Sequence, residues 1–281
     1  MRRLAWILLL VGSCSKPPGS EPVTRSFADS RGKIVTVPWP PRRIVSILPS
    51  ATELLFAVGA GEQVAGVTTY CDWPPEAKTK PKIGDIVVDY ERLANLKPDL
   101  VVTFWSLTPK TGAEIEGKGY PVFSLESRSL EDIISSLRTV GALTGHETQA
   151  ESCAATLVAR VKAVSREPGP TFYFEHSAEP LGTAGPGTYT GDALRRAGGR
   201  NIFDDGWRLI DWESVMARDP EIILIAHDRN EDFEKRAGWS KLRAVIHKRV
   251  YFVAKEHYVY PTPRLADGLE EAARIFREKN P

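Results

Sequence analysis

Apolar residues recur at helical spacing along a long polar stretch in the middle of the chain. Between His146 and Glu167, successive apolar positions lie four or three residues apart, and most other side chains are charged or hydrophilic. This pattern predicts one surface helix over residues 146–167 with a single packed face. A Pro-Gly-Pro sequence at residues 168–170 ends it. The predicted face consists of Ala150, Ala154, Leu157, Val161 and Val164.

The segments on either side of this helix repeat one pattern. Residues 91–104 and 213–226 each begin with Glu, reach Pro seven positions later and continue through an acidic residue into an apolar run. Such a run is typical of a buried parallel strand. Upstream of each, residues 53–59 and 192–198 match as helices that end at Gly. Two similar α/β lobes are therefore expected, one on each side of a helical bridge.

This repeat divides the chain into three folded parts. We expect one lobe at residues 23–127, a helical connection at 128–167 that contains the 146–167 helix, and a second lobe at 168–281. A chain of 281 residues with 42% apolar content can bury two modest cores. The formal net charge is +1 and the sequence holds no run of Lys and Arg, so a nucleic-acid-binding face is excluded.

The first residues have the composition of an export signal. Met-Arg-Arg precedes an apolar run, residues 4–11, that is too short to cross a bilayer. The small residues before Cys14 resemble the bacterial lipobox, in which the cysteine is lipidated and becomes the mature N-terminus. We therefore expect a signal peptide at residues 1–13, a lipidated tether at 14–22 and an extracytoplasmic, membrane-anchored protein. An ordinary secretory leader is the alternative.

Two further cysteines, Cys71 and Cys153, raise the questions of a disulfide bond and of an enzymatic function. Cys153 falls on the predicted bridging helix and Cys71 in a first-lobe loop, so we expect them to be unpaired. A hydrolase with Cys71 as nucleophile and His176 or His257 as base is the alternative from another functional class. Because the sequence contains no recognisable nucleophile turn, we expect a binding protein and not an enzyme.

Candidate ligand-binding residues lie where the predicted strands end. In open parallel sheets, ligands bind beyond the carboxyl ends of the strands. In the first lobe, aromatic residues are frequent at and after these ends, and a helix begins after the strand at residues 43–48. The first-lobe candidates are Pro49, Ser50, Tyr70, Trp73, Asp85, Phe104 and Trp105.

The second lobe repeats this placement. His176, His227 and His257 each follow a predicted strand, and aromatic residues lie nearby. Aromatic faces on both lobes indicate a flat or bulky ligand clamped between them. A dedicated metal site needs three or four convergent ligands. The three histidines could converge, but a polar lining is the favoured role, so no dedicated metal site is expected. The second-lobe candidates are His176, Trp207, His257, Tyr258 and Tyr260.

Several motifs resemble the cobalamin, haem and ferric-siderophore class of substrate-binding proteins that serve bacterial ABC importers. They follow the family's order from about Arg43 to the C-terminus, and the cobalamin-binding branch is the most similar. The resemblance implies a class III periplasmic-binding-protein fold, in which two Rossmann-like α/β lobes are bridged by a single long rigid helix. The motifs are RIVSILPSATELLFAVG at 43–59, YCDWPP at 70–75, LKPDLV at 96–101, GGRNIF at 198–203 and Pro263-Arg264, together with the lipobox.

The resemblance also assigns roles to particular residues. Tyr70 and Trp207 fall on aromatic ligand contacts of the cobalamin branch, and Phe104 lies where that branch has Trp. Glu91 and Glu213 fall on two lobe-tip carboxylates that pair with arginines of the membrane permease. Their alternative role is structural, because a carboxylate near a helix start is stabilised by the helix dipole.

The sequence departs from the cobalamin branch at two positions, so other ligands stay open. An aromatic residue expected near Asp85 is missing, and Tyr260 replaces a basic contact. Haem-binding relatives use Tyr or His as the iron ligand, for which Tyr70, His257 and Tyr258 are candidates. A siderophore would favour a basic cleft, for which Arg264 is the candidate. We expect a monomer without a cofactor that captures cobalamin or a related corrinoid and delivers it to an ABC importer.

Overall fold

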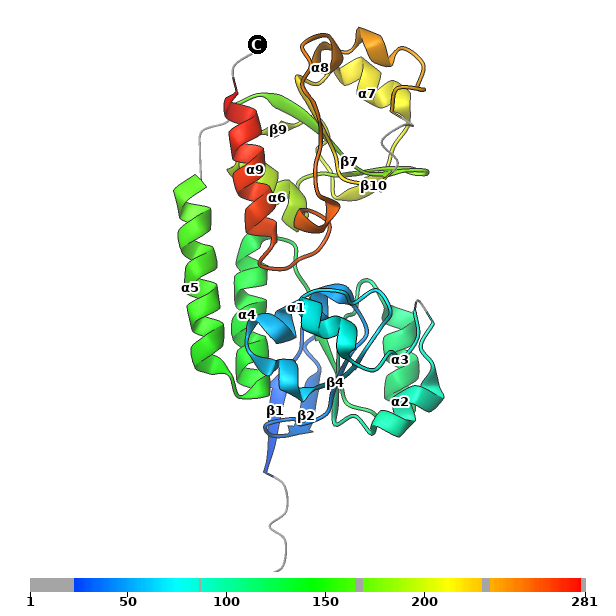
Figure 1. Ribbon diagram of the computed structural model, residues 1–281, viewed down its shortest axis with the longest axis vertical. Helices are drawn as coiled ribbons and strands as arrows, with labels where there is room; N and C mark the ends of the chain where they lie inside the picture. Colours follow the sequence, from blue (N-terminus) through cyan, green and yellow to red (C-terminus); the bar gives the residue numbers. More distant parts are fainter. Residues whose placement is uncertain (1–22, 86, 165–168, 229–232, 279–281) are drawn as a thin grey trace, which may run out of the picture.

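Two lobes lie one above the other, and a pair of long helices runs along one side of both (Figure 1). This computed structural model describes residues 23–85, 87–164, 169–228 and 233–278. The predicted signal peptide, Cys14 and the tether lie outside these residues. Among the described residues, no helix combines the length and apolar character needed to cross a membrane.

The N-terminal lobe is built on a parallel sheet in the order β4-β3-β5-β6. A separate antiparallel hairpin, β1 and β2, precedes it. The strands are β1 (Thr24–Ala28), β2 (Ile34–Pro38), β3 (Ile44–Ser46), β4 (Val64–Val67), β5 (Leu100–Phe104) and β6 (Val122–Leu125). The helices are α1 (Pro49–Ala57), α2 (Tyr90–Leu96) and α3 (Pro109–Gly117), with short 3-10 turns η1 (Ala60–Gln63) and η2 (Pro75–Thr79).

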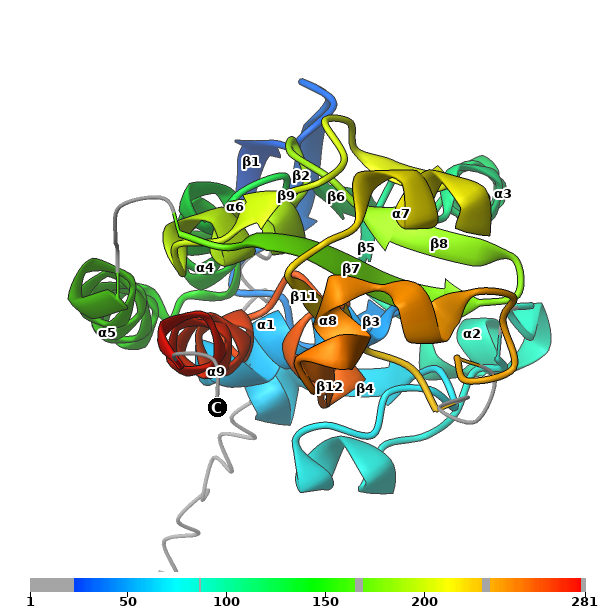
Figure 2. The same ribbon diagram turned by 90° about the horizontal axis from the view of Figure 1, so that it is seen from above.

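The C-terminal lobe contains a six-stranded sheet in which β9, β7, β11 and β12 are parallel, β8 pairs antiparallel with β7, and β10 pairs antiparallel with β8. Figure 2 shows its helices arranged on both sides of this sheet. The strands are β7 (Thr171–Ala178), β8 (Leu181–Ala184), β9 (Arg200–Asn201), β10 (Trp207–Leu209), β11 (Ile222–Ile225) and β12 (Val250–Phe252). The helices are α6 (Tyr189–Arg196), α7 (Trp212–Arg218), α8 (Arg243–Ile246) and α9 (Leu265–Arg277), with turns η4 (Trp239–Lys241) and η5 (Lys255–His257).

The sequence repeat corresponds to a repeated topology. In each lobe the first parallel strand is central, the second lies on one side of it, and the third and fourth lie on the other. The helices α2 and α7 have seven residues each, and aspartates at positions 89 and 211 cap their first turns. Both end at a residue in the left-handed conformation, Lys97 in one lobe and Asp219 in the other. The expected fold of two related α/β lobes is confirmed.

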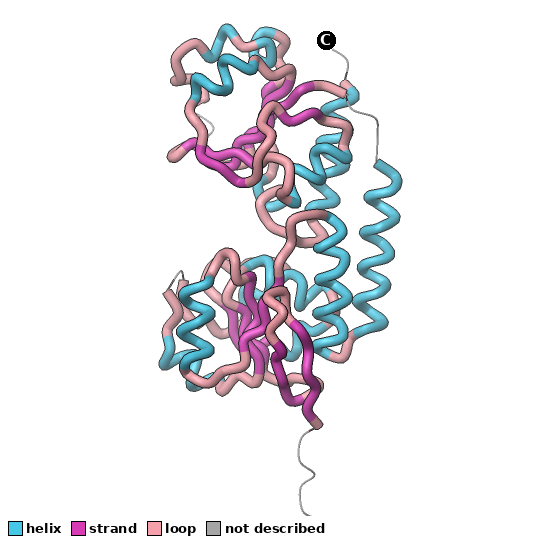
Figure 3. The backbone as a smooth tube through the Cα atoms, turned by 180° about the vertical axis from the view of Figure 1, so that it is seen from behind, coloured by secondary structure: helices cyan, strands magenta, loops and turns pink. Residues whose placement is uncertain are grey.

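The bridge between the lobes is a helical hairpin and not one isolated helix. α4 (Leu130–Thr144) runs away from the C-terminal lobe, turns at Gly145 and is followed by α5 (Glu147–Val164), which runs back beside it (Figure 3). The buried residues of α5 are the five that the apolar pattern predicts. The hairpin packs tightly, because a Cβ atom added to Gly141 would lie 2.3 Å from the Cβ of Ala150. Residues 165–167 of the predicted helix lie outside the described residues.

Candidate ligand-binding cavity

A cavity of about 550 Å³ lies between the lobes, at the carboxyl ends of the central strands. The N-terminal lobe contributes the start of α1 and the residues that follow β5 and β6. The C-terminal lobe contributes the end region of β7, the start of α6, one residue of β10 and the segment 259–261. This is the position at which open parallel sheets bind ligands.

Aromatic side chains form much of the C-terminal wall. Trp207 is 42% exposed on strand β10. The ring of His176 meets it edge to face at a centroid distance of 4.9 Å, and the ring of Tyr189 lies 5.4 Å from it. The hydroxyl of Tyr189 donates a 2.7 Å hydrogen bond to the carbonyl of Val259. The indole of Trp207 is therefore partly exposed and is packed against two neighbouring rings. Phe104 of the N-terminal lobe lines the same cavity.

The polar groups of the cavity are mostly uncharged. Burial lowers the pKa of His176 below its ordinary value, so its imidazole is neutral at pH 7. The hydroxyl-bearing residues Ser50, Ser106, Ser127, Thr188 and Tyr260 also line the cavity, with one acidic residue, Glu126, and one basic residue, Arg128.

Six of the predicted residues line this cavity, and the sequence reasoning missed others. Residues 126–128 follow β6 directly, so the strand-end rule would have found them if it had been applied to that strand. Thr188 and Tyr189 open α6, as two of the predicted residues open α1 in the other lobe. The repeat therefore contained the signal for them. The predicted residues that line the cavity are Pro49, Ser50, Phe104, His176, Trp207 and Tyr260.

Seven predicted contacts do not line this cavity: Trp73 and Arg264 lie at a second one, and the other five lie elsewhere. Tyr70 is 55% exposed, and Asp85 is exposed with its carboxylate accepting a hydrogen bond from the N–H of Val87. Trp105 lies beneath the guanidinium of Arg31, 3.9 Å from its ring centre, and packs against α3. His257 is partly buried at the end of η5.

The prediction for Tyr258, the fifth of these contacts, is wrong. Its side chain is fully buried, and its hydroxyl donates to the carbonyl of Gly268, 2.9 Å away, and lies 3.0 Å from a Glu271 carboxylate oxygen. It is a core residue that holds the start of α9. The three residues expected as iron ligands for haem, Tyr70, His257 and Tyr258, are therefore absent from the cavity lining.

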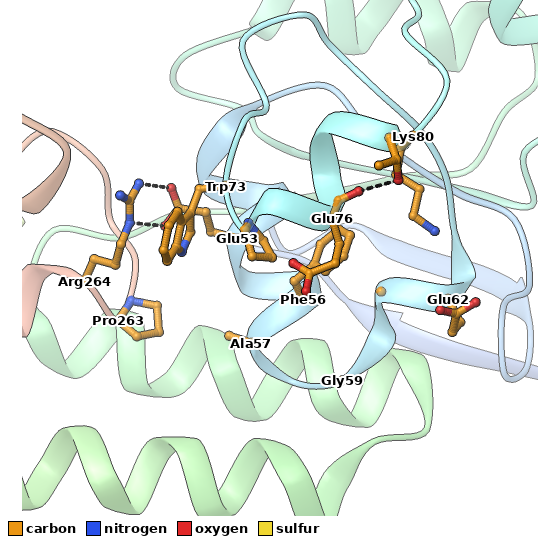
Figure 4. Close-up of a pocket in the computed structure, with 13 residues that line it drawn as sticks. Glu53, Phe56, Ala57, Gly59, Glu62, Trp73, Glu76, Lys80, Pro263 and Arg264 are labelled. Carbon is orange, nitrogen blue, oxygen red and sulfur yellow. Dashed lines mark hydrogen bonds and ion pairs between the residues drawn. The ribbon is translucent and has the colours of Figure 1, made fainter.

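Trp73 and Arg264 lie at a second cavity, of about 640 Å³, beside α1 (Figure 4). The guanidinium of Arg264 donates to both carboxylate oxygens of Glu53, at 2.5 and 2.9 Å, and its carbon lies 5.0 Å from the centre of a Trp73 ring. Burial raises the pKa of Glu53, and Arg264 opposes this effect only in part. Arg264, the candidate basic contact for a siderophore, is engaged in this contact between the lobes and does not line the first cavity.

The remaining candidates for chemistry, Cys71, Cys153 and His227, lie outside the cavity lining. Cys71 is buried, with its sulfur 3.2 Å from the hydroxyl of Thr68, away from the cavity lining. Cys71 and Cys153 are both free thiols. His227 lies 2.8 Å from a carboxylate oxygen of Glu175 in the C-terminal lobe. No cluster of three or more metal-ligating side chains occurs in the described ranges.

Glu91 and Glu213 occupy equivalent positions in the two lobes. Each is an exposed second residue of its helix, α2 or α7, and both helices lie on the side of the molecule away from α5 (Figures 1 and 2). Neither residue lines the cavity. Their placement fits a role in an external contact as well as the alternative of a helix-start carboxylate.

Comparison with known proteins places the chain in a family. Residues 44–256 match the periplasmic binding protein family. An uncharacterised ABC transporter substrate-binding lipoprotein of Bacillus subtilis is 30% identical, covering 90% of this chain and 84% of that protein. A vitamin B12-binding protein of Pectobacterium atrosepticum is 29% identical, covering 71% of this chain and 76% of that protein.

Solved structures agree with this assignment. The vitamin B12-binding protein of Vibrio cholerae superposes with a TM-score of 0.75 at 23% identity, covering 85% of this chain and 97% of that one. A haem-binding protein of Pseudomonas aeruginosa gives a TM-score of 0.72 at 27% identity, covering 84% and 92%. With two related lobes, a cavity between them and a family match over most of its length, the chain belongs to the periplasmic binding protein family and is a solute-binding protein.

Proposed function

We propose that this protein captures a corrinoid, the ligand class of vitamin B12, between its lobes and delivers it to an ABC importer. The observation that carries the proposal is the aromatic lining of the cavity, with Trp207, His176 and Tyr189 on one lobe and Phe104 on the other. Large conjugated rings stack favourably on such surfaces. The names of relatives from Pectobacterium and Bacillus support the ligand class and the importer.

The charge of the cavity favours a corrinoid over haem. A corrin ring carries uncharged amides along its edge, whereas haem carries two carboxylates that need cationic partners. The cavity offers one acidic residue, one basic residue and a neutral imidazole at pH 7. Haem is the second candidate, because His176 presents this imidazole at the cavity wall and could serve as an iron ligand.

We further propose how the protein is held and how it docks. Cys14 would carry the lipid anchor, which the lipoprotein name of the Bacillus relative supports. Glu91 and Glu213 would bind arginines of the permease, one at each lobe, and the protein would act as a monomer. The exposure of both carboxylates and their symmetric placement support this docking.

Co-elution tests the ligand class directly. The soluble domain from residue 20 onward is mixed separately with cyanocobalamin, haemin and a ferric hydroxamate, and the protein peak from gel filtration is analysed by visible absorption. We expect corrinoid absorption at about one ligand per chain and no retained siderophore. Retention of haemin alone, with its intense Soret band, would transfer the proposal to haem.

A further inference from the structure

One buried residue of the cavity lining has a hydroxyl without a hydrogen-bond partner among the described residues. Ser127 is 5% exposed and lines the cavity, and its Oγ makes no hydrogen bond within the described residues. Ser124, on strand β6 just before it, differs: its Oγ accepts from the N–H of Trp105 and also contacts the hydroxyl of Ser30. A buried hydroxyl without a partner is unfavourable unless a ligand or water satisfies it.

The sheet order places Ser127 on the N-terminal side of the cavity. Ser50 follows β3, Phe104 ends β5 and Ser127 follows β6, and these three strands are neighbours in that order. Ser127 therefore leaves the sheet on the other side of β5 from Ser50, and both serines line the N-terminal side of the cavity. A ligand held between the lobes would meet Ser127 on this side.

We propose that Ser127 is a specificity-determining residue whose hydroxyl donates a hydrogen bond to the carbonyl oxygen of an amide on the corrin ring edge. This inference rests on the proposed corrinoid function. A serine hydroxyl both donates and accepts, so it matches a neutral amide without introducing a charge. Its burial shields the bond from water, which makes its loss measurable.

The test compares Ser127→Ala with the unmodified protein in titrations with cyanocobalamin and with cobinamide. Cobinamide keeps the ring amides but lacks the nucleotide. Ser127→Ala should weaken both ligands by a similar factor, about 3- to 10-fold. Ser152→Ala is the control, because Ser152 is exposed on α5 and lies outside the cavity lining. Its loss should change the affinities by less than about twofold.

The melting temperature of the ligand-free variant separates this role from a structural one. Removal of an unpartnered hydroxyl should leave that temperature unchanged or slightly higher. Unchanged affinity for both ligands, a loss confined to cyanocobalamin, or a marked fall in melting temperature would overturn the assignment of Ser127. If the unmodified protein binds neither corrinoid, the proposed function itself fails, and the Ser127 inference with it.

Discussion

The carboxylate of Glu53 accepts two hydrogen bonds from the guanidinium of Arg264 and thereby joins the two lobes (Figure 4). Glu53 lies on α1 of the N-terminal lobe, and Arg264 immediately precedes α9 of the C-terminal lobe. Both side chains are largely buried. The segment that carries Arg264 also contributes Tyr260 and Pro261 to the ligand cavity, whereas the ion pair itself lines the second cavity.

Loss of Arg264 alone should be strongly destabilising. Arg264→Met leaves the buried Glu53 carboxylate without its cation, which should cost about 3–5 kcal/mol of unfolding free energy. The double variant Glu53→Gln, Arg264→Met should recover part of this loss. Urea denaturation measures both. Arg138→Met is the control, because Arg138 makes an equally bidentate but exposed pair with Glu151. If Arg264→Met were as stable as Arg138→Met, the structural role of the pair between Arg264 and Glu53 would be contradicted.

A matching contact joins the C-terminal lobe to the helical hairpin through the equivalent helix of the repeat. Asp192 on α6 accepts a hydrogen bond from the N–H of Leu130 at the start of α4. Arg196, also on α6, pairs with Glu131. Thus α1 contacts the start of α9, and α6 contacts the start of α4. The first contact joins the lobes directly, and the second joins the C-terminal lobe to the helical hairpin that bridges them.

Acid should destabilise the C-terminal lobe through Glu175. Burial alone raises the pKa of this carboxyl. Hydrogen bonds from Arg236 and His227 and the positive charge of Arg236 outweigh burial and bring the pKa below its ordinary value of 4.5. A depressed folded-state pKa gives stability that is present above the unfolded value and is lost as the pH falls through the folded value. Thermal melts from about pH 7 to pH 3 should show a decline beginning near 4.5. Glu175→Gln should melt at a lower temperature than the wild type at neutral pH, and its melting temperature should fall less steeply with acid. Parallel curves of melting temperature against pH for the two proteins would contradict this account.

The surface carboxylates of Glu91 and Glu213 should matter for transport and not for ligand capture. The double reversal Glu91→Lys, Glu213→Lys should leave corrinoid affinity unchanged and abolish uptake in proteoliposomes with the permease, because like charges repel at the docking surface. Replacement of a carboxylate at a helix start also removes about 0.3–1 kcal/mol of stability, so melting temperatures are measured together with uptake.

Glu147→Lys provides the matched control for this reversal. Glu147 is an exposed carboxylate at the start of α5, on the opposite side of the molecule. Its reversal should leave uptake normal. Normal uptake with a well-folded double variant would return Glu91 and Glu213 to the role of helix-start residues.

The proposed anchor can be tested without the ligand. Cys14→Ser should prevent incorporation of labelled fatty acid and release the protein from the membrane fraction, while its affinity for corrinoid stays the same. Wild-type protein that never incorporates the label would instead support an ordinary secretory leader.

The sequence predicted the fold well because the repeat and the apolar stripe of α5 are local patterns that packing preserves. The ligand-binding residues were harder to predict. Tyr258 and Val259 are adjacent, yet the first lies in the core and the second lines the cavity, because they belong to an irregular segment without strand or helix periodicity. The partnership of Arg264 with Glu53 spans 211 positions of the chain. No spacing rule could have revealed it.

Two tryptophans of similar exposure allow the most direct test of corrinoid capture between the lobes. Trp207 lines the ligand cavity at 42% exposure, whereas Trp73 lies outside it at 46%. Calorimetric titration with cyanocobalamin should show one site per chain. Trp207→Ala should weaken binding by about 1–3 kcal/mol, roughly 5- to 150-fold, and Trp73→Ala by less than about twofold. Absence of saturable binding to the wild type, or equal losses in the two variants, would contradict capture of a corrinoid against Trp207.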